Sequence, residues 1–218
     1  MLRLLFEKKD NAVWISHLDL MRLFQRAFKR AGLPLTHTKG FNPRPSVSIA
    51  LPLSVGVTSG CELLDFELDG LEVSCEEIRH RLNGALIDGV RVLEVYADGR
   101  KLKDLALLQC SVILEYNHMP NGCVGQIQQL FAQEELLVEK KSKNGIQEQN
   151  IIPMIRTLEV AMENDNILCL QAVVHCQNPS LNPMQLVAAI ERYLPQLQPD
   201  FSYCCRQEIY DESMNIFR

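Results

Sequence analysis

Residues 36–57, THTKGFNPRPSVSIALPLSVGV, bring cations, an aromatic ring and an amide together in a segment shaped by glycine and proline. A cation can pair with phosphate, a ring can stack on a base, and an amide can bind a base edge. Glycine permits a positive φ, and proline stiffens its neighbours. In the alternative interpretation, the phenylalanine belongs to the core and the prolines only form a turn. The nucleic-acid-binding candidates are Lys39, Phe41, Asn42 and Arg44, and the residues that shape the loop are Gly40, Pro43 and Pro45.

A basic amphipathic helix is expected before this loop, over residues 16–32 (SHLDLMRLFQRAFKRAG). Ser16 is a good N-cap, and Asp19 follows where the acid of a capping box belongs. Gly32 and Pro34 form a stop signal. Apolar residues recur at helical spacing and should face the core: Leu20, Leu23, Phe24, Ala27 and Ala31. Basic residues recur at i, i+4, i+7 and i+8 and should form a stripe on the opposite face: Arg22, Arg26, Lys29 and Arg30.

The helix and the loop belong to a strongly basic segment of an acidic protein. Residues 1–50 hold nine Lys/Arg and three Asp/Glu, a net charge of +6, whereas the remaining 168 residues carry −11. A basic segment on an acidic chain is a candidate anion-binding face. The alternative is a solvated helix surface that happens to be basic. We predict that Lys39, Arg44 and the helical stripe form one continuous positive surface, with His17 and Asn42 near its edge.

The elements that must hold this surface follow the order β-α-β-β-α-β in the first half of the chain. Residues 12–15 are read as extended, as part of a strand or hairpin that enters the first helix. This order is that of the split βαβ unit of ferredoxin-like domains. Strands are expected over 2–6, 46–53, 61–70 and 90–97, and helices over 16–32 and 74–86.

A similar pattern recurs after a polar linker at residues 98–104, interrupted by a polar insertion at 142–150. We therefore expect an α+β protein of two tandem ferredoxin-like (split βαβ) halves. The basic domain covers residues 1–100, and the acidic domain covers 101–218. In the second domain, strands are expected over 105–116, 136–141, 155–165 or 167–176, and 201–211, and helices over 122–133 and 182–194.

Eight cysteines are present, without a C-x-x-C pair or a Cys/His cluster of zinc-ligand spacing. We expect buried, reduced thiols with no metal and no cofactor, and the alternative is a metal site assembled from distant cysteines. The opening run MLRLLF ends after six residues, and no stretch approaches the roughly 18 apolar residues of a membrane span. We expect a cytoplasmic protein with no membrane partner.

Much of residues 1–95 resembles the radical-SAM-linked domain family of unknown function, which occurs in bacteria alone or behind a radical SAM domain. The segments that carry the resemblance are SHLDLMRLFQRAFKRAGLP, KGFNPRPSVSIALPLSVGV and SGCELLDFEL. The family usually has a G-F-x-P-x-P segment, which Gly40, Phe41, Pro43 and Pro45 match. Members often have His at one or both of its variable places, where this chain has Asn42 and Arg44.

The resemblance implies a partnership with a separate radical SAM enzyme that acts on RNA, such as tRNA or rRNA. This chain lacks a three-cysteine cluster of radical-SAM spacing, so it cannot hold that iron–sulfur cluster alone. The departure at Asn42 and Arg44 weakens any proposal of a histidine base in the loop.

A looser similarity is architectural, because tandem ferredoxin-like halves with a basic loop are similar to CRISPR repeat-processing endoribonucleases. Such enzymes cut RNA with a general base, often His, and without metal. This similarity makes His17, in the first turn of the basic helix, the catalytic candidate, and the alternative is local packing or hydrogen bonding. Three functions stay open: an RNA-binding accessory protein for a radical SAM enzyme, a metal-independent endoribonuclease, and a module that docks on the enzyme without RNA.

Overall fold

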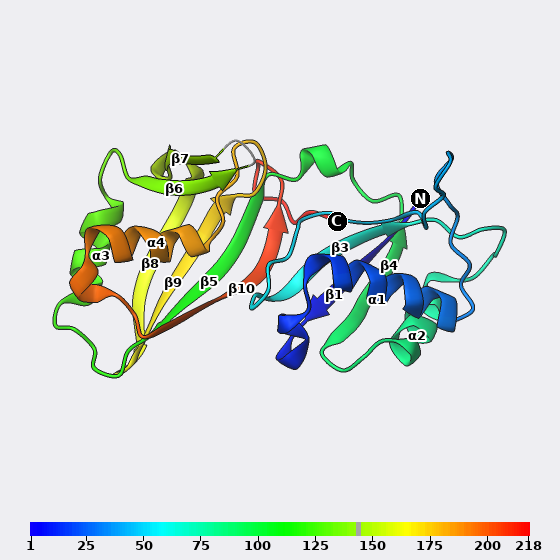
Figure 1. The fold of residues 1–218 in the computed structure, drawn as a ribbon, viewed down its shortest axis with the longest axis horizontal. Coiled ribbons are helices and arrows are strands. Elements are labelled where there is room, and N and C mark those ends of the chain that lie inside the picture. Colours follow the sequence, from blue (N-terminus) through cyan, green and yellow to red (C-terminus); the bar gives the residue numbers. More distant parts are fainter. Residues whose placement is uncertain (143–144) are drawn as a thin grey trace. The chain divides into compact units, whose positions relative to one another are not determined.

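The computed structural model describes residues 1–142 and 145–218 and divides the chain into two units (Figure 1). Unit 1 comprises Met1–Asp104 together with Arg218, and unit 2 comprises Leu105–Phe217. Both units combine α-helices with antiparallel β-strands. The protein is therefore of the α+β class, as the sequence predicts.

Unit 1 is an antiparallel sheet covered by α-helices. Its strands lie in the order β4-β1-β3-β2, and each neighbouring pair is antiparallel. The helices α1 and α2 lie over one face of this sheet (Figure 1). The bounds are β1 (Leu2–Lys8), α1 (His17–Arg30), β2 (Val47–Ile49), β3 (Thr58–Phe66), α2 (Cys75–Ala85) and β4 (Val90–Ala97).

The helix α1 has the ends that the sequence predicts. The Ser16 hydroxyl oxygen accepts a hydrogen bond from the Asp19 backbone N–H at 3.2 Å, which satisfies one of the free donors of the first turn. The helix stops at Arg30, and Gly32 has φ +66°, a left-handed conformation that glycine adopts at little cost. The N-cap at Ser16 and the stop signal are confirmed, whereas the Asp19 carboxylate accepts from the Ser16 hydroxyl and not, as in a capping box, from the Ser16 N–H.

The core of unit 1 is formed where α1 packs on the sheet. The Phe6 ring of β1 meets Phe24 edge-on with centroids 4.8 Å apart, and Phe28 meets Phe66 of β3 at the same distance. Phe28 is a core residue absent from the predicted set. The predicted residues Leu20, Phe24 and Ala27 are fully buried, whereas Leu23 and Ala31 are only partly buried.

Residues 12–15 form no strand, which corrects the expectation there, although the backbone of Ile15 is extended. A short 3-10 helix spans Asp10–Trp14 and places the Ala12 side chain in the core. The Lys9 N–H donates to the Gly89 carbonyl at 2.8 Å, just before β4 begins. The conformation is therefore decided by the burial of the Ala12 side chain and by this backbone contact. The composition of residues 12–15, which is typical of a strand, does not predict it.

Unit 2 is also an antiparallel sheet with helices. Its strands lie in the order β10-β5-β9-β8, and each neighbouring pair is antiparallel. Both segments proposed for its middle strands are strands, β8 and β9. The bounds are β5 (Leu107–Glu115), α3 (Cys123–Phe131), β6 (Leu137–Ser142), β7 (Gly145–Asn150), β8 (Ile155–Asn164), β9 (Ile167–His175), α4 (Met184–Tyr193) and β10 (Phe201–Tyr210).

The polar insertion expected at residues 142–150 is corrected in part, because residues 145–150 form strand β7. This strand pairs with β6, from Leu137 opposite Asn150 to Ser142 opposite Gly145. The expectation for positions 143 and 144 lies outside the described residues. Strand β7 contains no buried residue and exposes Ile146 at 62%, so it lacks the hydrophobic alternation that predicts a half-buried strand.

The described residues contain no helix long and apolar enough to cross a membrane. Within the same residues, no group of three or more His, Cys, Asp or Glu side chains is placed to hold a metal ion. All eight cysteines are free thiols, and five of them are buried: Cys61, Cys110, Cys123, Cys169 and Cys204.

Candidate nucleic-acid interface

The segment that joins α1 to β2 projects from unit 1 as a hydrogen-bonded finger, defined here as residues 36–46 (Figure 1). Its two arms are tied together by backbone bonds from Thr38 to Arg44 and from Ser46 to Thr36, each 2.8 Å long. The Arg44 N–H also donates to the Thr38 hydroxyl at 3.0 Å. At the base, the Thr36 N–H donates to the Glu67 carbonyl at 2.9 Å. The finger is therefore an element with its own internal hydrogen bonds and not an irregular linker.

The tip of the finger exposes an aromatic ring beside polar side chains. Phe41 has a relative exposure of 107%, so the interpretation of this ring as a core residue is wrong. Lys39 and Asn42 are exposed on either side of it, and Gly40 has φ +137°, a conformation that other residues rarely adopt. Neither Lys39 nor Arg44 forms an ion pair with any residue that the structure describes.

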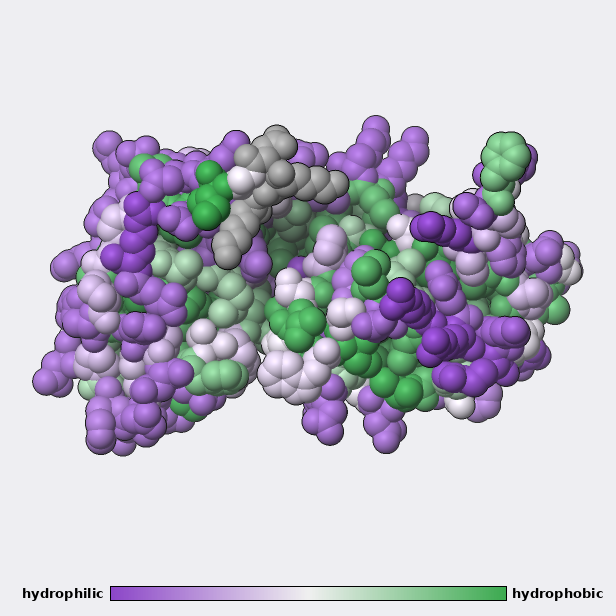
Figure 2. Space-filling model, viewed as in Figure 1, coloured by the Kyte–Doolittle hydropathy of each residue, from purple (hydrophilic) through white to green (hydrophobic). Residues whose placement is uncertain are grey.

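Three arginines of the predicted stripe line one depression of about 470 Å³ beside α1, which we call the α1 groove. Arg22, Arg26 and Arg30 stand one helical turn apart, and their spacing of four residues gives a repeat of about 6 Å along the helix axis. The other residues that line the groove are Ile15, Asp19, Leu23 and Ile87. Figure 2 shows the strongly hydrophilic side chains gathered over α1, next to hydrophobic surface.

The arginines of the α1 groove differ in how they are held. Arg22 forms an exposed ion pair with Asp19, with 2.9 Å between Nη1 and Oδ1. The Ser16 hydroxyl donates to the other oxygen of Asp19 at 2.7 Å. This hydrogen bond, and then that from Arg22, lower the pKa of Asp19 below its ordinary value, so the carboxylate stays ionised. Asp19 therefore offsets the charge of Arg22 at one end of the groove.

Further along the groove, Arg26 and Arg30 form no ion pair with a carboxylate within the described ranges, and Asp19 interacts with Arg26 only at longer range. The Arg30 guanidinium donates to the Ala85 carbonyl at the end of α2, which orients it without neutralising its charge. Arg26 makes no such bond to a described residue. The positive charge of the groove is therefore concentrated at Arg26 and Arg30.

The structure does not bring every predicted residue to the groove. Lys29 is exposed on α1 but does not line the groove. His17 is the first residue of α1, and its Nδ1 is buried without a hydrogen-bond partner among the described residues. Lys39 and Arg44 belong to the finger, and a single positive surface that joins them to the helical stripe stays a prediction.

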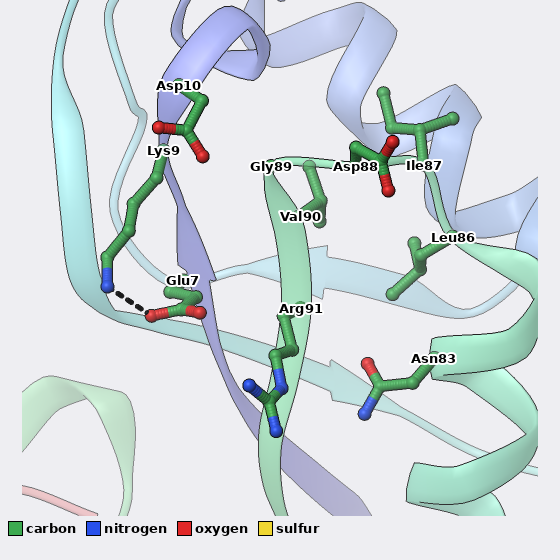
Figure 3. Close-up of a pocket in the computed structure, with 10 residues that line it drawn as sticks. All are labelled: Glu7, Lys9, Asp10, Asn83, Leu86, Ile87, Asp88, Gly89, Val90 and Arg91. Carbon is green, nitrogen blue, oxygen red and sulfur yellow. Dashed lines mark ion pairs between the residues drawn. The ribbon is translucent and has the colours of Figure 1, made fainter.

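A second depression, of about 340 Å³, shares only Ile87 with the α1 groove and is drawn in Figure 3. Several of its charged and polar groups already have partners. Lys9 pairs with Glu7 at 2.6 Å, and Asn83 holds the Val92 backbone by bonds of 2.9 and 2.8 Å. Figure 3 shows these residues around the start of β4, where they support the fold.

The apolar part of the α1 groove was not predicted from the sequence. Leu23 was expected in the core, and Ile15 and Ile87 belong to no predicted site. Ile87 is 43% exposed, although it follows α2 directly and lies far from α1 in sequence. In the sequence, the signal for this apolar surface is Leu23, which stands among the basic residues of the stripe. Only the packing of α1 against α2 brings Ile87 to the groove.

A comparison with protein-family models matches residues 1–183 to a family described as "Uncharacterized protein conserved in bacteria (DUF2344)". A comparison with curated proteins finds no match. The chain is similar to solved structures, among them one titled "Crystal Structure of a Cbf5-Nop10-Gar1 Complex", with 10% identity and a TM-score of 0.48. That alignment covers 97% of this chain and 50% of the solved chain.

Two further similar structures were found. The structure of an "H/ACA RNP bound to a substrate RNA containing 2'-deoxyuridine" has 10% identity and a TM-score of 0.46, and it covers 94% of this chain and 46% of that one. The "Unknown Protein from Galdieria sulphuraria" has 13% identity and a TM-score of 0.27, with 96% of both chains covered. This chain thus spans about half the length of the H/ACA proteins it matches. With TM-scores below 0.5, these likenesses carry no functional conclusion.

Proposed function

This chain belongs to the DUF2344 family of bacterial proteins, and we propose that it is an RNA-binding accessory protein that presents RNA to a separate radical SAM enzyme. The observation that carries the proposal is the full exposure of Phe41 at the tip of a hydrogen-bonded finger. Exposing a phenylalanine ring to water is unfavourable, and the ring packs on no core residue. A role in recognition explains why unit 1 holds the ring there between Lys39 and Asn42.

The charge of unit 1 supports RNA as the ligand. The α1 groove offers three guanidinium groups in a row, and guanidinium groups match the geometry of phosphate. The finger adds Lys39 and Arg44, whose side chains form no ion pair with the described part of the chain. Cations without carboxylate partners can release bound counterions when they meet a polyphosphate backbone.

The proposed partner is suggested by the likeness of residues 1–95 to domains linked to radical SAM enzymes, together with the charge of unit 2. Unit 2 holds six Lys/Arg and thirteen Asp/Glu, a net charge of −7, which disfavours contact with RNA and suits a basic protein surface. The eight free thiols are compatible with function in the cytoplasm, where thiols remain reduced.

We also infer that each unit is a ferredoxin-like module, which extends the α+β assignment. In unit 1 the strand order β4-β1-β3-β2 is that of a split βαβ unit. In unit 2 the order β10-β5-β9-β8 repeats it, with β10, β5, β9 and β8 in the places of β4, β1, β3 and β2. The β6–β7 hairpin is then an insertion after the first helix of the second module.

The proposed function is tested by measuring RNA binding of the full chain at low salt by fluorescence anisotropy. We expect cellular RNA to bind and Arg26→Glu/Arg30→Glu to weaken binding about tenfold or more, because two phosphate contacts become repulsive. The control is Lys101→Glu/Lys103→Glu, which makes the same charge change at exposed positions outside the finger and the α1 groove. Absence of binding, or equal binding by the first variant and wild type, rules the function out.

The partnership requires its own measurement. Co-purification of the chain with radical SAM enzymes from a bacterial lysate should succeed, and RNase treatment should leave the protein contact intact. If the complex forms at an A260/A280 ratio typical of protein alone, and the chain binds no RNA, the protein-interaction alternative replaces the proposed function.

A metal-independent endoribonuclease is the second candidate function, because the His17 side chain is partly exposed and forms no hydrogen bond with a described residue. Its Nδ1 is buried, so the other ring nitrogen, Nε2, is the atom that would take the proton. A general base needs a nitrogen that is free to take a proton. The chain is incubated with total RNA in EDTA, and the products are separated on a gel. Cleavage that disappears in His17→Ala supports this candidate, and absence of cleavage, or cleavage that survives the substitution, removes it.

A further inference from the structure

We propose that the RNA segment bound by unit 1 is unpaired, with phosphates along the α1 groove, bases against its apolar wall, and one base stacked on Phe41. This inference rests on the proposed function and deepens it by naming the class of RNA. Two features of the described residues support it independently, the wall of the α1 groove and the ring at the tip of the finger.

The α1 groove combines charge with apolar surface in a way that suits single strands. Its arginines share the depression with Ile15, Leu23 and Ile87, of which Ile87 is 43% exposed. A duplex keeps the faces of its bases stacked inside and offers a protein mainly phosphates and 2′-hydroxyls. Such a ligand gives the apolar wall nothing to contact, whereas an unpaired strand can turn its bases toward it.

The size of the α1 groove leads to the same conclusion. A volume of about 470 Å³ lies within the range of small-ligand sites, which is about 300–1,000 Å³. A nucleotide unit with its base can enter such a depression. A double helix can only lie across its rim.

The charge distribution within the groove sets the order of the phosphate contacts. Asp19 is ionised and paired with Arg22, so a phosphate at that end meets a carboxylate as well as a guanidinium. Arg26 and Arg30 form no ion pair with a described carboxylate, Asp19 acts on Arg26 only through a weaker electrostatic interaction, and the Ala85 carbonyl orients Arg30. We therefore assign the stronger phosphate contacts to Arg26 and Arg30, and the weaker one to Arg22.

The ring of Phe41 supplies the second argument. Its relative exposure of 107% leaves both faces open, and the arms of the finger hold it away from the sheet. Stacking of an unpaired base on an aromatic side chain contributes about 1–3 kcal/mol, which is roughly a fivefold to hundredfold change in affinity. In a duplex both faces of a base are covered by the neighbouring bases, so the Phe41 ring finds no base face to stack on.

The test measures binding of the full chain to a mixed-sequence RNA of twelve nucleotides and to its blunt duplex, by anisotropy at matched salt. We expect the unpaired RNA to bind at least tenfold more tightly, and Phe41→Ala to weaken that binding roughly fivefold to hundredfold while the affinity for duplex stays unchanged. Phe41→Trp should restore binding, since a larger ring also stacks. Arg26→Ala should weaken binding to the unpaired RNA more than Arg22→Ala does.

The control is Phe201→Ala, which removes another exposed phenylalanine, 55% exposed on β10, and should leave both affinities unchanged. Because the Phe41 side chain is exposed, its variants should melt at the wild-type temperature. If the duplex binds as tightly as the single strand, or if Phe41→Ala weakens both equally, the inference is wrong while RNA binding stands. If neither RNA binds, the proposed function fails as well.

Discussion

Arg3 and Asp65 face each other across β1 and β3 and are joined by two hydrogen bonds, Nε to Oδ1 at 2.6 Å and Nη2 to Oδ2 at 3.0 Å. The third arm of the guanidinium donates to the Arg100 carbonyl at 2.8 Å. The two residues are only 3% and 6% exposed. One buried cation therefore ties two strands to the segment that follows β4, and each of its three guanidinium nitrogens donates to the protein.

Replacing Arg3 by Met should destabilise the protein strongly, since it leaves the Asp65 carboxylate buried without its partner. Removing one member of a buried pair costs about 3–5 kcal/mol. The measurement is the free energy of unfolding in urea. The control is Arg79→Met, which breaks an exposed pair with Glu76 and should change the free energy of unfolding far less, because solvent screens that pair. Equal losses in the two variants contradict the structural role of the Arg3–Asp65 pair.

Gly89 should tolerate no side chain. Its φ is +83°, and a Cβ there would lie 2.5 Å from the Lys9 carbonyl oxygen and 2.9 Å from the Ala12 Cβ. Backbone strain and overpacking together predict that Gly89→Ala costs about 2–4 kcal/mol. Gly84 is the matched control, because it lies in α2 with open space around it. Thermal melts should show Gly84→Ala stabilised by about 0.5–1 kcal/mol, and a Gly89→Ala variant as stable as wild type would disprove the close approach.

The two cations of the finger should act through charge and not through folding. Each phosphate contact contributes about one unit to the slope of log affinity against log salt, so Lys39→Ala/Arg44→Ala should flatten that slope by roughly two units. The same measurement on Lys101→Ala/Lys103→Ala should leave the slope unchanged. The melting temperature should stay the same in both double variants. An unaltered slope in the finger variant means that Lys39 and Arg44 contact no phosphate.

Alkaline pH should weaken unit 2 through the half-buried thiol of Cys176. Burial raises the pKa of Cys176 from its ordinary 9.0 to about 12, so the folded state disfavours the thiolate. The stability that this thiol contributes is complete below about pH 9 and is lost as the pH rises toward 12. Between pH 8 and pH 10 the loss from this group is about 1 kcal/mol.

Urea unfolding at pH 8 and pH 10 measures this loss, and Cys176→Ala should lose about 1 kcal/mol less than wild type. The control is Val174→Ala, which removes buried apolar atoms without a titrating group. That variant should be less stable at both pH values and should show the same dependence on pH as wild type. If Cys176→Ala keeps the full wild-type dependence, another group is responsible.

Local patterns were sufficient to predict much of unit 1. The limits of β4 were predicted at Val90 and Ala97, and α1 begins after its predicted N-cap, Ser16. Both features depend on a few neighbouring residues, because strand composition and helix caps act locally. The prediction failed at residues 12–15, where a buried Ala12 and a contact with the distant Gly89 decide the conformation. It also overestimated the strand expected over 46–53, because β2 covers only Val47–Ile49.

The sequence by itself determined the chemistry of the finger and the basic character of α1, because charge, ring and glycine are properties of the residues themselves. Only the tertiary structure decided that Phe41 points into solvent, since exposure depends on what the rest of the chain covers. It also decided that Leu23 and Ile87 share a groove with Arg26. Residues more than sixty positions apart meet there because α1 and α2 pack on the same face of one sheet, and helical spacing within either helix carries no information about its neighbour.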